Sequence, residues 1–193
     1  MLGLKLATDP RWVNIAEISL EDILTDHAYC EQKAASSGIS LIVHFPDKSR
    51  LVEEVTPLVA EEWGHFRKVL KELNRRGLKL GRQRRDQYVI ELLKLKKKGG
   101  SREDQLLEEL LIFAMIEARS CERFRLLSLH ISDESLRQFY HEFMVSEAGH
   151  YTLFLDLAKE YNDAEKVRLR WNEILEGEAD IMKRMEWRSD RVH

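Results

Sequence analysis

The hydrophobic and polar positions of the chain follow a helical rather than an extended pattern. Strict alternation of apolar and polar residues, which marks a half-buried strand, is hard to find, and Leu, Glu, Lys and Arg are frequent. Only 3 prolines and 9 glycines interrupt the pattern. We predict an all-α protein with a short helix at about 86–97 and five long helices, at about 19–43, 49–76, 101–130, 132–161 and 164–187. The first eighteen and the last six residues are expected to be irregular.

Residue types that favour helix ends support these bounds. Pro46 stops the first helix, and Gly77 suits the left-handed conformation that often follows a helix end. Pro57 lies inside the second helix, where it either kinks the helix or, with Thr56 as N-cap, restarts it. Serines are expected to cap three helix starts, one of them in a capping box with Asp104: Ser19, Ser101 and Ser132.

Length and composition set bounds on the class of protein. A chain of 193 residues suits a single domain with a sizeable core. The formal net charge of −3 says little about partners by itself. No signal peptide opens the chain, and no apolar run reaches the roughly 18–20 residues of a membrane span. A cytoplasmic enzyme is therefore expected, with Cys30 and Cys121 as reduced, small core residues rather than metal ligands or a disulfide.

One short motif occurs twice. Glu62–Phe66 reads EWGHF, and Glu147–Tyr151 reads EAGHY 85 residues later, so both contain Glu-x-Gly-His followed by an aromatic residue. Glutamate and histidine at positions i and i+3 share one face of a helix, where they can bind the same metal ion. A single copy is weak evidence, because a helix surface carries such pairs by chance. Two copies with the same neighbours indicate metal ligands.

The repeat extends to the helix that precedes each copy. Glu31 begins EQKAA and Glu117 begins EARSC, and both segments read Glu, any residue, basic, small, small. Glu31 precedes Glu62 by 31 residues, and Glu117 precedes Glu147 by 30. Both midpoints fall where turns are expected, at Pro46–Asp47 and Ser132. In antiparallel hairpins the two glutamates of each pair would therefore lie at one height.

Two such hairpins together offer four carboxylates and two imidazoles. This is the ligand set of ferritin-like di-iron and di-manganese proteins. Carboxylate and imidazole ligands suit Fe or Mn, and four carboxylates balance two divalent cations. The predicted ligands are Glu31, Glu62, His65, Glu117, Glu147 and His150. The predicted fold is a ferritin-like four-helix bundle of two antiparallel hairpins in a single domain, 1–193, with a long crossover at about 77–100 and an extra C-terminal helix at about 164–187.

Several polar or small residues near the motifs need a separate interpretation. His27, one turn before Glu31, is either a hydrogen-bonding partner of the ligands or an ordinary helix residue. Gly64 and Gly149 each cost roughly 1 kcal/mol of helix propensity relative to Ala, which suggests a local reason for both, such as letting neighbouring backbone or side chains approach the metals closely. Four further glutamates are expected to be solvated: Glu61, Glu108, Glu109 and Glu122.

The segment that joins the hairpins is strongly basic. Residues 67–102 contain 14 Lys and Arg against 3 Asp and Glu, a net charge of +11, so the rest of the chain carries −14. Such asymmetry is expected of a protein that binds a polyanion. The alternatives are a solvated loop, or a patch that pairs with acidic helices of the same chain. The candidate phosphate contacts are Arg82, Arg84, Arg85, Lys96, Lys97 and Lys98.

The chain resembles a known family over almost its whole length. Its segments DHAYCEQKAA, EEWGHF, IEARSCERF and SEAGHY, with the basic LGRQRRDQY and LLKLKKKGGSR, are similar to those of the MiaE-like bacterial tRNA hydroxylases. The resemblance implies a non-haem di-iron centre that uses O2 to hydroxylate the isopentenyl side chain of 2-methylthio-N6-isopentenyladenosine, the base beside the anticodon. It also implies ligand roles for the six residues that the repeat selects.

The resemblance implies two partners, the anticodon loop of tRNA and an electron donor. The sequence has no CxxC pair and no Rossmann glycine pattern, so the electrons are expected to come from a separate ferredoxin or reductase. One rival function, a ferritin- or rubrerythrin-like iron oxidase or peroxide reductase, shares the ligands but needs no basic crossover. A second rival is a non-enzymatic helical bundle that binds RNA, with the Glu and His residues incidental.

Overall fold

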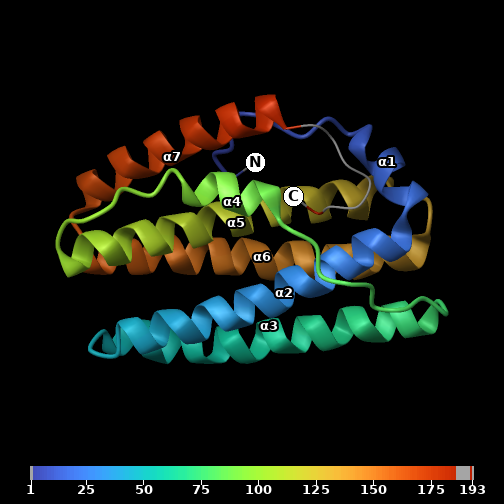
Figure 1. Ribbon diagram of the computed structural model, residues 1–193, viewed down its shortest axis with the longest axis horizontal. Coiled ribbons are helices and arrows are strands. Elements are labelled where there is room, and N and C mark those ends of the chain that lie inside the picture. The colour runs from blue at the N-terminus through green and yellow to red at the C-terminus, as the bar shows by residue number, and fades with distance from the viewer. Residues whose placement is uncertain (1, 186–191, 193) are drawn as a thin grey trace. The chain divides into compact units, whose positions relative to one another are not determined.

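The computed structural model describes residues 2–185 and residue 192, and every regular element among them is a helix (Figure 1). This confirms the all-α prediction. None of these helices combines the length and the apolar composition needed to cross a membrane. In chain order the helices are α1 (Trp12–Ile18), α2 (Leu20–His44), α3 (Ser49–Arg75), α4 (Gln87–Leu93), α5 (Arg102–His130), α6 (Glu134–Tyr161) and α7 (Ala164–Arg184).

The helix bounds differ from the predicted ones at both ends of the chain. The expectation of an irregular N-terminal segment is wrong for α1, which buries Trp12, Val13 and Ala16. Its seven residues are too few to show a helical period in sequence. The short helix α4 ends at Leu93 rather than near 97. The predicted end of the last helix at 186–187 lies outside the described residues, as do the last six residues except Val192.

Most helix ends have the chemistry that the residue types predict. Gly77 adopts φ +70°, and the amides of Gly77 and Leu78 donate to Asn74 O and Leu73 O at 3.0 and 2.9 Å, a Schellman motif that ends α3. Ser101 and Asp104 form the predicted capping box at α5. One predicted cap is wrong, because Asp133 and not Ser132 caps α6. Ser19 is the N-cap residue of α2, as predicted, but its side chain makes no capping hydrogen bond.

Helix α3 runs through Pro57 without a break, which excludes the restart at Thr56, one of the two alternatives left open by the sequence. Proline has no N–H to offer the helix. The Thr56 hydroxyl donates instead to the carbonyl of Val52 at 2.6 Å, a bond back into the preceding turn.

The chain divides into two compact units. One comprises residues 14–85 with Val192, and the other comprises residues 2–13 and 86–185. We call them the α2–α3 unit and the α5–α6 unit after the helical hairpin in each. In the α2–α3 unit, the hairpin turns at the predicted position, where Lys48 N donates to Phe45 O at 3.1 Å. Gly38 permits close packing, because a Cβ there would lie 2.6 Å from Val59 Cγ2.

The α5–α6 unit is held together by buried charge as well as by apolar packing. Arg119 of α5 is completely buried and donates to Glu178 of α7, with N–O distances of 2.9 and 2.6 Å. Tyr88 of α4 donates to the same carboxylate at 3.2 Å. Arg119 also pairs with Glu122 and donates to Leu6 O at 3.0 Å. This network fastens α4, α7 and the N-terminal segment to α5.

Candidate metal centre

The α2–α3 unit brings three of the predicted ligands together. Glu31 lies on α2, and Glu62 and His65 lie on α3. His65 Nδ1 is 3.3 Å from Glu31 Oε2 and 3.6 Å from Glu62 Oε2. One donor atom from each residue lies within 4.8 Å of the other two. We call these residues the α2–α3 triad.

The α5–α6 unit brings together the other three. Glu117 lies on α5, and Glu147 and His150 lie on α6. His150 Nδ1 is 3.3 Å from Glu147 Oε2, so each histidine directs the same ring nitrogen to the glutamate three residues before it. Donor atoms of all three residues again lie within 4.8 Å of one another. These residues form the α5–α6 triad.

Each triad suits a divalent cation by its chemistry. Two carboxylates and one imidazole are hard or borderline donors of the kind that Fe and Mn accept. Donors bonded to one ion at about 2.1 Å lie within about 4.2 Å of one another, so only a small contraction is needed. All four glutamates are at most 6 % exposed, and buried carboxylates are costly unless a cation compensates them. The donor set therefore fits a metal ion in each unit.

His27 contacts a predicted metal ligand and is not an ordinary helix residue. Its ring is completely buried, and Nε2 lies 2.7 Å from Glu31 Oε1, while the other oxygen of Glu31 faces His65. The contact lacks hydrogen-bond geometry, but a polar group outside the ligand set can still orient a metal-binding side chain and tune its basicity. Of the two interpretations open at the sequence level, the structure favours this one.

A polar residue four positions before each histidine faces the remaining ring nitrogen. His65 Nε2 is 3.7 Å from Glu61 Oε1, and His150 Nε2 is 3.4 Å from Ser146 Oγ. Sequence reasoning set Glu61 aside as solvated, which agrees with its half-exposed side chain, and did not select Ser146. Their position four residues before each histidine, on the same helix face, could have identified both residues from the sequence.

Comparison with known proteins places the chain in a family. The model of the family described as tRNA-(MS[2]IO[6]A)-hydroxylase (MiaE) matches residues 2–193. The chain belongs to this family. The tRNA 2-(methylsulfanyl)-N(6)-isopentenyladenosine(37) hydroxylase of Pseudomonas putida is 38% identical over 156 residues, covering 81% of this chain and 75% of that protein. The enzyme of the same name from Salmonella typhimurium is 33% identical over 207 residues, covering 83% and 75%.

A solved structure also resembles this MiaE-family chain. It is described as Protein 43 with aldehyde deformylating oxygenase activity from Synechococcus. The TM-score is 0.92 and the sequence identity 31%, over 98% of this chain and 94% of that one. The predicted ferritin-like fold class, with its paired helical hairpins, is thereby confirmed.

Two of the glutamates expected to be solvated are buried in this member of the MiaE family. Glu108 accepts bonds of 2.7 and 2.8 Å from Arg170 of α7. Glu122 accepts from the Thr8 amide and hydroxyl at 2.8 and 2.7 Å. The expectation of solvation is wrong for both, because each has a buried cation as partner. Neither belongs to a triad. Glu109 is half-buried and pairs with Lys96.

The cysteines agree with their predicted roles. Both are free thiols, Cys121 buried and Cys30 partly so. Cys121 Sγ lies 3.3 Å from Met144 O, and burial raises the pKa of its thiol to about 12. A thiol that stays protonated at neutral pH is a weak donor group rather than a nucleophile.

The glycines of the repeated motif have no close neighbour. A Cβ built on Gly64 or Gly149 would meet nothing within 4 Å, and both residues are exposed. Among the described residues, no group uses the space beside either glycine, so the structure gives no support to the expectation that they let neighbouring groups approach the metals closely. Close packing among the described residues therefore does not explain why these two positions are glycine.

Gly64→Ala is expected to raise the free energy of unfolding by about 1 kcal/mol, because alanine favours the helix and has free space here. Gly38→Ala is the matched control and should lower it, since its Cβ would clash with the stiff, β-branched Val59 at 2.6 Å. Thermal unfolding followed by circular dichroism measures both. Destabilisation by Gly64→Ala would mean that another group occupies the space over this glycine.

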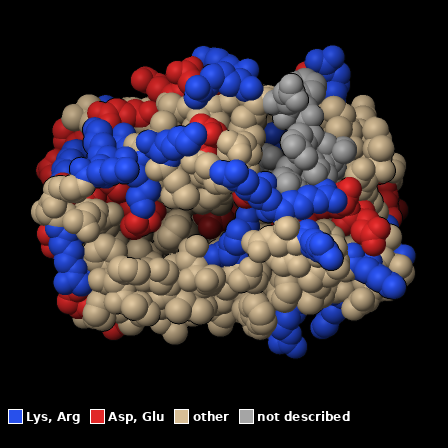
Figure 2. Space-filling view, in the orientation of Figure 1, with Lys and Arg blue, Asp and Glu red and all other residues tan. Residues whose placement is uncertain are grey.

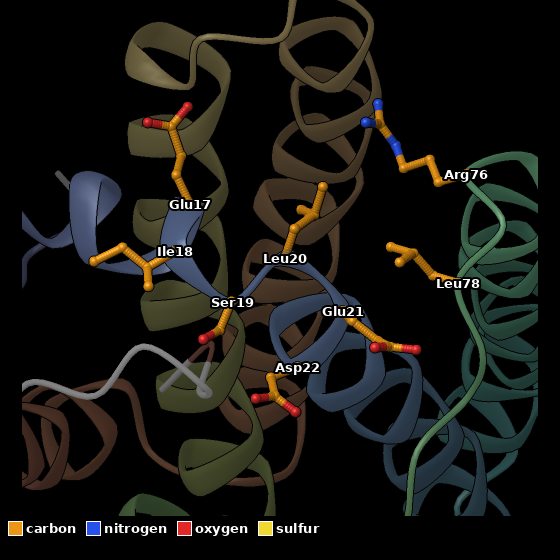
Figure 3. Close-up of a pocket in the computed structure, with 8 residues that line it drawn as sticks. All are labelled: Glu17, Ile18, Ser19, Leu20, Glu21, Asp22, Arg76 and Leu78. Atoms are coloured by element: carbon orange, nitrogen blue, oxygen red, sulfur yellow. The ribbon is translucent and has the colours of Figure 1, made fainter.

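A surface hollow in the α2–α3 unit is unsuited by its charge to the phosphates of the tRNA that the MiaE family name implies. It measures about 540 Å³ and lies where α1 meets α2, opposite the segment that follows α3 (Figure 3). Three carboxylates line it, from Glu17, Glu21 and Asp22, against the single cation of Arg76. Such a charge repels phosphate, although Ile18, Leu20 and Leu78 also line the hollow.

Many cations of the basic crossover have carboxylate partners in their own unit. Arg84 pairs with Asp22, Lys96 with Glu109, and Lys97 with Glu173 at 2.6 Å. Figure 2 shows Lys and Arg atoms beside Asp and Glu atoms around α4 and the loop after it. No described carboxylate pairs with Arg82 or Lys98. The high positive charge of the segment is thus partly compensated within the chain.

Proposed function

We propose that the protein is an O2-dependent monooxygenase that hydroxylates the isopentenyl side chain of 2-(methylsulfanyl)-N6-isopentenyladenosine in tRNA. The observation that carries this proposal is the match of the hydroxylase family to residues 2–193, a chain in which both copies of the repeat form a triad that could hold a metal ion. The relatives at 38% and 33% identity, which bear the name of this activity, support it. A tRNA substrate also implies a cytoplasmic protein.

The proposed cofactor is one pair of non-haem iron ions held by the two triads together. Ferritin-like proteins take a Glu from each of two helices and Glu-x-x-His from each of the other two, and this chain supplies that set. When bound, the iron pair would supply O2 activation and a path for two electrons. The four carboxylates would balance two divalent charges, which removes the cost of burying them.

The residues around the triads would hold the ligands in place. His27, whose Nε2 lies 2.7 Å from Glu31 Oε1, would help to fix the orientation of that carboxylate. Ser146 would face Nε2 of His150, and Glu61 would face Nε2 of His65. In each histidine the other nitrogen, Nδ1, faces the glutamate three residues earlier. An adenosine of a single-stranded anticodon loop can leave its stack at small cost, so its side chain can reach a buried centre.

Two partners belong to this proposal. The first is the tRNA itself, with phosphates held in part by Arg82, Arg84, Arg85, Lys96, Lys97 and Lys98. Among these six, Arg82 and Lys98 are expected to contribute most, because a phosphate need not displace a carboxylate of the chain from them. The second partner is an electron donor, such as a ferredoxin or reductase.

The test is oxygen incorporation. With iron, an electron source and labelled O2, tRNA that carries the isopentenylated adenosine should gain one labelled oxygen atom in that nucleoside, measured by mass spectrometry after digestion. Unmodified tRNA is the control and should gain none. Product oxygen from water, or rapid oxidation of bulk ferrous iron without tRNA product, would instead favour a ferritin-like iron oxidase.

A second candidate function is oxygenation of an aldehyde. The likeness to the Synechococcus protein, whose description names aldehyde deformylating oxygenase activity, favours it. The same preparation should therefore be offered a long-chain aldehyde under the same conditions. We expect no product from it. Aldehyde turnover together with inert tRNA would replace the tRNA hydroxylase proposal.

A further inference from the structure

The solvent-facing side of α3 carries an aromatic residue and two cations in line. Trp63 is 49 % exposed, and Arg67 and Lys71 are also exposed. The three follow one another at intervals of four residues, so they lie on successive turns of the same helix face. In Figure 2 Lys and Arg atoms project along the bottom of the view, where the C-terminal half of α3 runs. We call these three residues the α3 strip.

The cations of the α3 strip resemble Arg82 and Lys98 of the crossover, and differ from its Arg84, Lys96 and Lys97, in having no described carboxylate partner. No carboxylate of the described residues pairs with Arg67 or Lys71. One turn further along, Arg75 pairs with Glu72 at 2.7 Å. Uncompensated cations on a rigid helix bind an anion without first losing an ion pair.

The Trp63 ring packs against a neighbouring ring and is also accessible to solvent. Its ring centroid lies 4.9 Å from that of Phe66, which fixes the ring from one side. The next residue is Gly64, where even a Cβ would have no neighbour within 4 Å, so the helix surface beside the ring is bare. Among the described residues of α3, Trp63 is the only exposed large hydrophobic side chain. A single exposed tryptophan needs no explanation by itself, but here it adjoins two uncompensated cations.

We propose that the α3 strip binds single-stranded RNA of the tRNA substrate, with an unpaired base stacked on Trp63 and backbone phosphates on Arg67 and Lys71. Aromatic platforms beside cations are the usual means of holding single strands. An acidic protein partner fits less well, because protein interfaces bury about 800 Å² per side around an apolar core, and α3 offers one ring. The inference rests on the proposed function for the identity of the RNA.

The test is tRNA binding by the iron-loaded protein without reductant, across a salt series. Trp63→Ala should weaken binding by roughly tenfold or more, with no change in salt dependence, because stacking releases no counterions. Trp63→Phe should restore most of the loss. Arg67→Gln with Lys71→Gln should flatten the log–log salt slope by about 1.4, at about 0.7 per phosphate contact on a single strand.

The matched control is Lys159→Gln with Lys183→Gln. This pair makes the same change in charge at exposed lysines that already pair with Asp156 at 3.3 Å and Asp180 at 2.9 Å. It should keep the slope and the affinity of the wild type. Strip variants that bind tRNA like this control would overturn the proposal. If those variants also required more of a protein electron donor for turnover, the strip would be a donor-binding surface instead.

Binding is measured apart from turnover, so the two proposals fail separately. Wild-type protein that binds tRNA through the strip but transfers no oxygen would remove the hydroxylase function and keep the RNA-binding surface. Oxygen transfer by wild type and strip variants alike, with equal KM for tRNA, would keep the hydroxylase function and remove the RNA-binding strip.

Discussion

Glu117→Ala or His150→Ala should abolish O2-dependent turnover while the helical fold remains. Each residue supplies one of three donors in the α5–α6 triad, where the donor atoms lie within 4.8 Å of one another. Loss of a group that merely orients a ligand costs about 10- to 100-fold in metal affinity or activity, so loss of the ligand itself should cost more than about 100-fold. Iron content per chain should fall well below the two ions expected for the wild type. Elemental analysis, a tRNA oxygen-incorporation assay and circular dichroism measure the three quantities.

Glu109→Ala is the control for this experiment. Glu109 lies on the same helix as Glu117, is half-buried and pairs with Lys96, but it belongs to neither triad. Its loss should leave iron content and turnover close to those of the wild type. Full iron loading and full turnover in Glu117→Ala would remove Glu117 from the centre, whatever the behaviour of the control.

Arg119→Met should produce the largest loss of stability among single substitutions outside the triads. The side chain is completely buried with Glu178, and its removal leaves that carboxylate without its cation. Breaking a buried ion pair on one side costs about 3–5 kcal/mol. For a chain of this size the midpoint of thermal unfolding should fall by about 10 °C. Arg168→Met, which removes an exposed partner of Glu165, is the control and should change stability by less than about 1 kcal/mol.

The loss in Arg119→Met should depend on pH in a defined direction. Burial raises the pKa of Glu178 above its ordinary value even with Arg119 present, and removal of the cation raises it further. A folded-state pKa above the unfolded one means that folding favours the protonated carboxyl, so the penalty is largest above that pKa and shrinks as pH falls through it. Denaturant titrations from neutral to mildly acidic pH should show the variant approaching the wild type. A gap that widens on acidification would contradict this account.

Local sequence signals predicted the hairpins and which predicted ligands lie together in each, because both depend on residues close in the chain. The capping box at Ser101 and the left-handed Gly77 act within one turn of their helices. The repeat then related the two hairpins without any knowledge of packing. The cap at Asp133 was missed by one residue, since Ser132 and Asp133 are both good capping types.

The burial of Glu108 and Glu122 could not be predicted in this way. Their partners lie far along the chain, Arg170 at 62 residues and Thr8 at 114 residues, and no periodicity links such positions. The same limit applied to the crossover. Its charge was visible in sequence, but the pairing of Lys97 with Glu173 was not. Because such pairs compensate part of the crossover charge, Arg67 and Lys71 of α3, which have no described carboxylate partner, become candidate phosphate contacts.

The binding of the N-terminal segment to α5 has a consequence for hydrogen exchange. Thr8 belongs to no helix, yet its amide donates to the buried Glu122 carboxylate at 2.8 Å. Amide hydrogens in irregular terminal segments normally exchange with solvent quickly, because small local openings expose them. The amide of Thr8 should exchange only when the segment leaves α5, on the timescale of the slow core amides. Deuterium uptake should therefore report the first residues of the chain as part of the same cooperative unit as α5.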